Sequence, residues 1–286
     1  MKQLNKKGWQ FVCLTIVLSS IPYFFIIKDG DTGSGWTLLL MWIPGIAGIL
    51  MRIWHKEGIF SQLVWNPLKG WKWILLAAFI PFIIEIATIV LAVSFDAATL
   101  KEGFITVENG EISIRGIAML FGASAQPWYA FLPNFILSYF AGTILYSVTL
   151  AIGEELGWRG YLQKEWGTTN SLFSFLMIGI IWGWWHLPGI LLGHNYPDYR
   201  LLGGFLIMPL VTMLFSIAFG VAYNSKRVIW VPVIFHGAVN ISAEISNSAF
   251  LEESINRPVN DLIWTGLWLL AAGTIWTQKL RFRNKS

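Results

Sequence analysis

The sequence predicts an all-α, polytopic membrane protein: a bundle of about eight spanning helices with both termini in the cytoplasm. The chain has 286 residues, of which 55% are hydrophobic and only 13% are charged. A soluble globular domain carries about 25% charged residues, so this chain has too little charge to cover a water-exposed surface. The 17 Trp residues also suit a chain with many membrane–water interfaces, where indole rings collect.

Eight apolar runs approach the roughly 20 residues that a spanning helix needs. They cover residues 9–27, 36–53, 73–95, 131–153, 172–192, 201–223, 228–246 and 262–277. The first run follows a basic start, as in a signal peptide, but it is longer than the about 7–15 apolar residues of such a segment. We therefore expect a retained helix and a single membrane domain over residues 1–286.

The positions of the basic residues predict the orientation of the spans. Fifteen of the 20 Lys and Arg residues fall on one side of the predicted topology and five on the other. Basic loops stay in the cytoplasm, so both termini are expected there. The net charge of +4 could suggest a nucleic-acid partner. Because the basic residues follow the predicted membrane topology instead, we expect no nucleic-acid partner.

The longest predicted connection, residues 96–130, lies on the side opposite the termini. It contains Asn109-Gly110 between apolar residues. An Asn-Gly pair in this setting can turn a β-hairpin. We expect a modest surface loop here rather than a hairpin.

Ionisable residues inside spanning helices are costly and are therefore candidates for function. The candidates are Glu85, Glu154, Glu155, His186, His236 and Glu244, with Asn240 as a polar neighbour. We expect Glu85 and Glu244 to be interior, hydrogen-bonded carboxyl groups outside the site, although Glu244 could also shape a substrate pocket. The single cysteine, Cys13, excludes an internal disulfide and a cysteine-only metal site.

The fourth span ends in a cluster of charges, with Glu154 and Glu155 followed by Arg159. Residues four apart share a helix face, so Arg159 is expected to neutralise Glu155. Adjacent residues point in different directions, which makes Glu154 a candidate general base. The alternative is that the three charges only mark the cytoplasmic end of a helix.

Two further pairs have the same spacing: Trp182 with His186, and His236 with Asn240. His186 could hold a water that Glu154 activates, while His236 and Asn240 could stabilise a developing oxyanion. Alternatively, Glu154, His186 and His236 would bind zinc and leave a position open for water. At about 1.5 Å of rise per residue, His186 lies too deep for this site unless its helix begins late or tilts.

These three motifs, within residues 131–245, together resemble the CPBP family of membrane proteins. The family groups CAAX prenyl endopeptidases with bacteriocin-processing and immunity-type proteins. The resemblance implies that Glu154 is the water-activating base and His186 its partner, with His236 and Asn240 as the oxyanion-stabilising pair.

Three other residues would support the site by the same resemblance: Glu155, Arg159 and Trp182. Trp182 departs from the family pattern, which usually has Phe at this position. The resemblance leaves open whether a divalent metal such as zinc takes part, and we favour a metal-free glutamate mechanism.

The predicted function is that of an intramembrane endopeptidase which cleaves a membrane-associated peptide or protein near the cytoplasmic face. Bacteriocin or pheromone-peptide processing would fit this activity. A non-enzymatic immunity or scaffold protein is the main alternative. A secondary transporter is less favoured, because the sequence shows no internal repeat and no paired interrupted helices.

Overall fold

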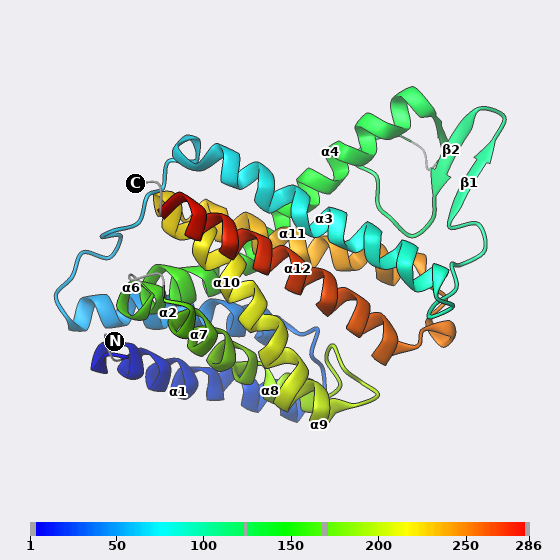
Figure 1. The fold of residues 1–286 in the computed structure, drawn as a ribbon. Coiled ribbons are helices and arrows are strands. Elements are labelled where there is room, and N and C mark those ends of the chain that lie inside the picture. The colour runs from blue at the N-terminus through cyan, green and yellow to red at the C-terminus, as the bar shows by residue number, and fades with distance from the viewer. Residues whose placement is uncertain (1–3, 123–124, 168–170, 284–286) are drawn as a thin grey trace. The chain divides into compact units, whose positions relative to one another are not determined.

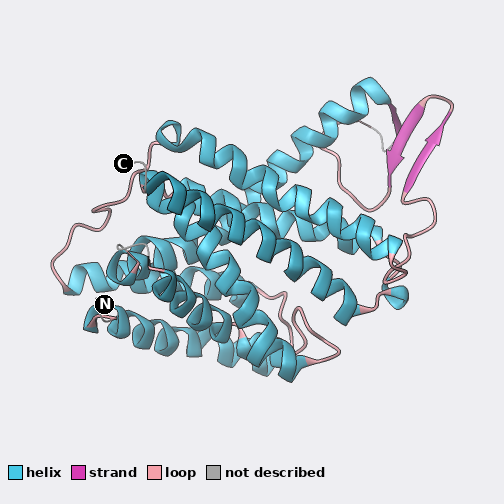
Figure 2. Cartoon of the chain, viewed as in Figure 1, coloured by secondary structure: helices cyan, strands magenta, loops and turns pink. Residues whose placement is uncertain are grey.

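The computed structural model describes residues 4–122, 125–167 and 171–283. The chain divides into two units. Unit 1 comprises Met1–Ile74, Thr149–Val233 and Trp268–Ser286, and unit 2 comprises Leu75–Val148 and Ile234–Leu267. Both units are built almost entirely from helices (Figure 1, Figure 2), which confirms the all-α prediction apart from one small sheet in unit 2.

Most elements of unit 1 are helices. They are α1 (Lys6–Asp29), α2 (Gly35–Trp54), α5 (Ile152–Gly157), α6 (Gln163–Trp166), α7 (Leu172–Trp185), α8 (Leu187–Leu191), α9 (Arg200–Leu202) and α10 (Met208–Lys226). Shorter turns join them: the 3-10 turn η1 (Pro67–Gly70) and the π-helical turns η3 (Trp158–Leu162) and η4 (Gly203–Ile207).

Unit 2 combines helices with a three-stranded sheet. It contains most of α3 (Trp71–Ser94), α4 (Trp128–Tyr146), most of α11 (Trp230–Ala249) and the first part of α12 (Arg257–Arg283). Its strands are β1 (Ile105–Glu108), β2 (Glu111–Ile114) and β3 (Ala125–Pro127), and the 3-10 turn η5 (Glu252–Ser254) precedes α12.

Within the described residues, five helical segments are long and apolar enough to cross a membrane. They are Lys6–Asp29, Gly35–Trp54, Pro67–Ser94, Trp128–Trp166 and Arg200–Lys226. They correspond to the first four predicted spans and the sixth, as in a multi-pass membrane protein. The eight-span count and the cytoplasmic termini stay predictions.

The fifth predicted span, residues 172–192, is not one continuous helix. Helix α7 has 14 residues and ends at Trp185, and α8 begins at Leu187. Pro188 lacks the N–H that would continue the helical hydrogen bonding, which explains a break at this point. The break places His186 between the two helices.

Glycine allows two pairs of helices in unit 1 to pack unusually closely. A Cβ atom added to Gly157 would lie 2.4 Å from the carbonyl carbon of Pro44 on α2. One added to Gly183 on α7 would lie 2.4 Å from the Cα atom of Pro209 on α10. Another glycine precedes each of these glycines by four residues. Such small-xxx-small patterns let membrane helices approach backbone to backbone.

The connection predicted as a surface loop contains a β-hairpin, so that expectation was wrong. Strand β1 pairs antiparallel with β2, and β2 pairs antiparallel with β3. Asn109 and Gly110 have φ angles of 51° and 81°. Positive φ at both central residues is the requirement of a two-residue hairpin turn, and an Asn-Gly pair meets it at little cost.

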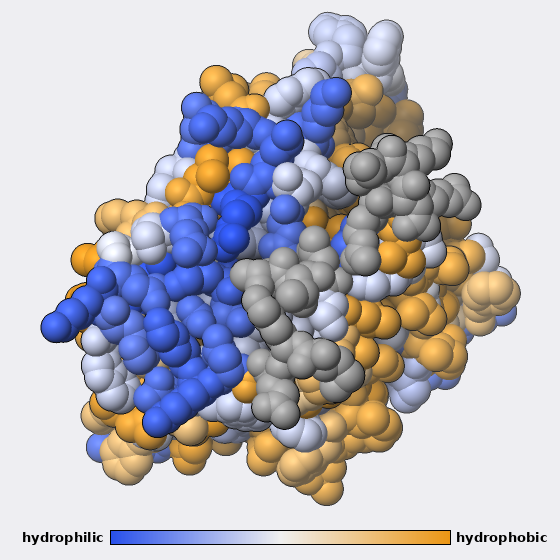
Figure 3. Space-filling model, turned by 60° about the vertical axis from the view of Figure 1, so that its left-hand side comes forward, coloured by the Kyte–Doolittle hydropathy of each residue, from blue (hydrophilic) through white to orange (hydrophobic). Residues whose placement is uncertain are grey.

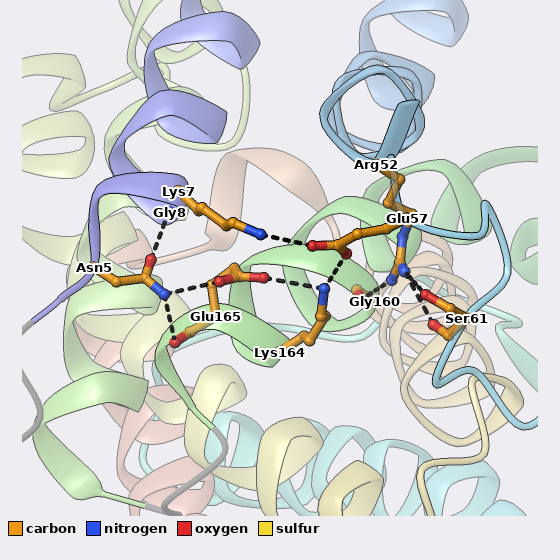
Figure 4. Close-up of polar contacts among 9 residues, drawn as sticks. All are labelled: Asn5, Lys7, Gly8, Arg52, Glu57, Ser61, Gly160, Lys164 and Glu165. Carbon is orange, nitrogen blue, oxygen red and sulfur yellow. Dashed lines mark hydrogen bonds and ion pairs between the residues drawn. The ribbon is translucent and has the colours of Figure 1, made fainter. Parts of the chain in front are cut away.

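A network of charged residues joins α1, the loop after α2, and α6 in unit 1 (Figure 4). Glu57 accepts hydrogen bonds from Lys7, at 2.8 Å, and from Lys164, which also lies 3.1 Å from Glu165. Burial opposes ionisation of Glu57, but the bonds from Lys164 and Lys7 outweigh it and lower its pKa from 4.5 to about 2.

Figure 3 shows one face of the molecule, on which hydrophilic residues gather beside a hydrophobic surface.

Candidate active site

The two glutamates of the predicted site lie on α5, a helix of 6 residues between two π-helical turns. The turn η2 (Ser147–Ala151) precedes α5, and η3 follows it. In η3 the carbonyl of Gly160 accepts a hydrogen bond of 2.7 Å from the buried Arg52 of α2 (Figure 4). Such turns are rare and occur frequently at functional sites.

Glu155 and Arg159 form the ion pair that their spacing predicts. Arg159 Nη1 lies 2.9 Å from Glu155 Oε1, and both side chains are fully buried. The guanidinium carbon of Arg159 also lies 4.4 Å from the ring centre of Trp182 and 5.0 Å from that of Phe219. A buried cation is stabilised by aromatic faces as well as by its counter-ion. These contacts connect α5 and η3 with α7 and α10.

Glu154 points away from this pair, as predicted, but it has partners of its own. Its Oε2 atom accepts a hydrogen bond of 2.6 Å from Trp182 Nε1 and one of 3.4 Å from Trp158 Nε1. Only 1% of Glu154 is exposed. Indole N–H groups are donors only, so both contacts favour the ionised carboxylate. Trp158 was not among the predicted site residues, although its i, i+4 spacing from Glu154 indicates a contact on one helix face.

The side chain of Trp182 therefore does what a Phe at this position cannot do. A Phe ring would still face Arg159, but it has no N–H to donate to Glu154. The contact also brings the end of α7 beside α5. Helix α7 begins at Leu172, where the predicted span also begins, and the hydrogen bond from Trp182 brings its last turn to Glu154. The expected depth of His186 in the membrane stays a prediction.

His186 lies just after α7, one turn beyond Trp182. Its Nδ1 atom is 2.7 Å from the carbonyl oxygen of Trp182. A carbonyl only accepts, so Nδ1 carries the proton in this contact, and Nε2 is the nitrogen that can accept a hydrogen bond when the ring is neutral. The ring of Trp185 packs 4.9 Å away, and Tyr23 of α1 donates a hydrogen bond of 2.6 Å to the Trp185 carbonyl.

His236 and Asn240 lie one turn apart on α11, in unit 2. His236 is buried and Asn240 is partly buried. Helix α11 packs closely on the end of α4, because a Cβ atom on Gly237 would lie 2.8 Å from the carbonyl oxygen of Thr143. The close approach predicted for Gly237 is thus confirmed. The predicted site residues are therefore distributed over both units, five in unit 1 and two in unit 2.

The remaining membrane carboxyl groups differ from each other. Glu85 is buried, and it accepts hydrogen bonds from Ser246 and, at 3.0 Å, from Trp264. This confirms the expectation of an interior, hydrogen-bonded group. Glu244 is exposed, so the same expectation was wrong for it. It sits on the face of α11 opposite Ser242 and Ser246, which are buried.

A metal site was the alternative for the same residues. Among the described residues, no group of three His, Cys, Asp or Glu side chains is arranged to hold a metal ion. Unit 1 offers Glu154 and the Nε2 atom of His186, whereas a catalytic zinc site uses three protein ligands.

Comparison with known proteins relates this site to a family. Residues 136–242 match the family model described as Rce1-like, type II CAAX prenyl endopeptidase. This segment is therefore similar to that family. It includes every residue from Glu154 to Asn240 of the three motifs. The family resemblance drawn from the motifs is thus confirmed.

A curated relative gives the same indication. The chain is 28% identical over 177 residues to CAAX prenyl protease 2 of Methanococcus maripaludis. The match covers 59% of this chain and 62% of the relative, so the chain spans less than two thirds of that protein. Both matches carry the CAAX description, and neither description names bacteriocin processing or a metal.

Proposed function

We propose that the protein is an intramembrane endopeptidase of the CAAX prenyl protease type, with Glu154 as its general base. The arrangement around Glu154 supports this most strongly. A buried carboxylate is costly, and here two indole donors stabilise its ionised form next to a histidine. The family similarity of residues 136–242 supports peptide hydrolysis as the reaction.

The proposed reaction begins with a water molecule between Glu154 and His186. Glu154 removes a proton as the water oxygen attacks the scissile carbonyl carbon, and His186 Nε2 orients the water by accepting its other hydrogen. The proton on Glu154 then passes to the leaving amine as the C–N bond breaks. Glu155 is compensated by Arg159, so the site carries one reactive carboxylate rather than two.

His236 and Asn240 would act on the other side of the reacting carbonyl. Their side chains can donate hydrogen bonds to the oxyanion that forms as water attacks. This role for His236 and Asn240 is part of the proposal. If zinc takes part instead, Glu154, His186 and His236 would hold it, and the ion would supply a polarised water.

The substrate we propose is a membrane-associated peptide or protein cut near the cytoplasmic face. The curated relative is named a CAAX prenyl protease, so a short peptide with a prenylated cysteine near its C-terminus is the first probe to use. A lipid-linked peptide would reach a site between apolar helices from the bilayer. The cytoplasmic position rests on the predicted positive-inside orientation.

The test is cleavage of a fluorogenic prenylated peptide, and of a peptide library, by the purified protein in lipid vesicles. The variants are Glu154→Gln and His236→Ala, with Glu244→Gln as a matched control on the exposed face of α11. We expect both site variants to lose activity and the control to keep it. A strong chelator distinguishes the two mechanisms, because only the metal-dependent one stops. Full activity of Glu154→Gln would contradict the proposal and favour a scaffold or immunity role.

A further inference from the structure

The β1–β2 hairpin of unit 2 has one apolar and one polar face. Directly opposite residues of paired strands point to the same side of a sheet, and successive residues alternate. The pairs Ile105–Ile114 and Val107–Ile112 therefore form an apolar face. The pairs Thr106–Ser113 and Glu108–Glu111 form the opposite, polar face, where Thr106 and Ser113 share a hydrogen bond of 2.6 Å.

The protein covers only part of the apolar face. On β2, Ile114 is 7% exposed and packs in a cluster with Phe104 and with Ala249 of α11. On β1, Ile105 is 58% exposed and Val107 is 69% exposed. The hydrophobic surface thus continues from Ile114 on β2 to the edge strand β1. There, the described residues leave more than half of Ile105 and Val107 exposed.

Two hydrogen bonds tie the base of the hairpin to the end of α11. Ser248 of α11 donates a hydrogen bond of 3.0 Å to the Gly116 carbonyl. The amide of Lys101 donates one of 2.8 Å to the carbonyl of Ala249. Ile114 of the apolar face accordingly packs against the helical part of unit 2, while Ile105 and Val107 of the same face stay mostly exposed.

Chain connectivity places the hairpin at the surface of the bilayer. It lies between the end of α3 at Ser94 and the start of α4 at Trp128, both in segments apolar enough to span (Figure 2). Trp128 and Tyr129 open α4 and are each 65% exposed. Exposed Trp and Tyr at the end of a span are typical of the headgroup region.

We propose that the bilayer itself covers the exposed part of this face. Ile105 and Val107 insert into the boundary between headgroups and acyl chains, and the Glu108–Glu111 side faces water. An apolar edge strand in water would invite pairing with other chains, whereas lipid removes this surface from water. The occupant is lipid rather than a peptide, since α3 and α4, which precede and follow the sheet in the chain, also expose apolar side chains such as Val90 and Leu132. The inference does not depend on the proposed protease activity.

The experiment measures the depth of neighbouring residues on the two faces. The exposed Cys13 is first replaced by Ala, so that each variant has one labelling site. Nitroxide labels are placed at Val107→Cys and, as the matched control, at Glu108→Cys, in vesicles of zwitterionic and anionic phospholipid. Collision with oxygen, which partitions into lipid, is compared with collision with a water-soluble nickel chelate.

We expect the label at position 107 to favour oxygen and to lie about 5 Å or more below the phosphates. The label at position 108 should favour the nickel chelate. Ile105→Cys and Thr106→Cys form a second pair, should the first disturb the turn. Equal nickel accessibility at positions 107 and 108 would overturn the proposal, because the hairpin would then stand in water. Low accessibility of position 107 to both reagents would also overturn it and would indicate a protein occupant.

Discussion

Each unit buries a carboxylate that accepts an indole hydrogen bond, yet the two surroundings differ. Glu154 in unit 1 bonds to Trp182 at 2.6 Å, and Glu85 in unit 2 bonds to Trp264 at 3.0 Å. Glu85 lies within the long helix α3, and it also accepts a hydrogen bond from the hydroxyl of Ser246. Glu154 lies on a six-residue helix between π-helical turns, one residue before an ion-paired glutamate.

This difference shows what a buried acid needs in order to be more than structural. A regular helix and neutral donors hold Glu85 between helices of one unit, which suits a packing role. At Glu154 the irregular backbone aims the carboxylate at the end of α7, where His186 follows after one turn. Burial and an indole donor are common to both sites, so the histidine and the helix irregularities are the distinguishing features.

The largest expected effect separates the two acids directly. Glu154→Gln should lower the turnover number about 10²–10⁴-fold, because an amide cannot serve as general base. Glu85→Gln should leave turnover close to wild type and lower the thermal unfolding midpoint. Steady-state kinetics and thermal unfolding of both variants in the same vesicles measure this. A comparable loss of turnover in Glu85→Gln would end the distinction.

The next effect concerns the ion pair beside Glu154. Arg159→Ala leaves the carboxylate of Glu155 buried without its counter-ion, so unfolding should become easier by about 3–5 kcal/mol. Replacing both partners, Glu155→Met with Arg159→Met, removes both buried charges and should be milder. Denaturant titration in detergent compares the two variants. If the double variant were less stable than the single one, the pair would contribute more than charge compensation.

A smaller effect is expected for the indole donors. Trp182→Phe removes one hydrogen bond to a charged carboxylate, a loss of about tenfold in turnover number. KM should change little, because the ring that faces Arg159 is retained. Trp264→Phe is the matched change at Glu85 and should leave turnover unaltered. Equal kinetics of Trp182→Phe and wild type would show that the indole contact does not orient Glu154.

The smallest effect concerns the surface carboxylate Glu57. Its folded-state pKa, about 2, lies below its ordinary value of 4.5, so the unfolded chain binds more protons in this interval. The stabilisation is present above about pH 5 and is lost as the pH falls from 4.5 towards 2. Glu57→Gln should flatten this part of the pH–stability curve. An unchanged slope in Glu57→Gln would assign acid sensitivity to other groups.

The sequence predicted those parts of the site that depend on neighbours along one helix. Spacing of four residues sufficed to pair Glu155 with Arg159 and to place His236 beside Asn240. It could also have revealed the contact between Trp158 and Glu154. The glycine pairs that bring α5 onto α2 and α7 onto α10 also have this spacing of four residues.

Other features depend on segments that are distant in the chain. Trp182 meets Glu154 across 28 positions, and this contact depends on how α7 packs against its neighbours, such as α10. Hydropathy predicted one continuous span where His186 separates two helices. It also favoured a loop where strands β1 and β2 pair, because four-residue strands carry too weak an alternation to stand out beside long apolar helices.

By itself, the sequence determined the membrane character, the helical class and the family resemblance of this protein, because composition and i, i+4 spacing are local properties. Only the tertiary structure decided how Glu154 is held, how the helix around it departs from regular geometry, and which face of the hairpin is apolar and uncovered. Those features arise from contacts between distant segments, where close packing at glycines and burial of polar groups select one arrangement among many that local spacing would allow.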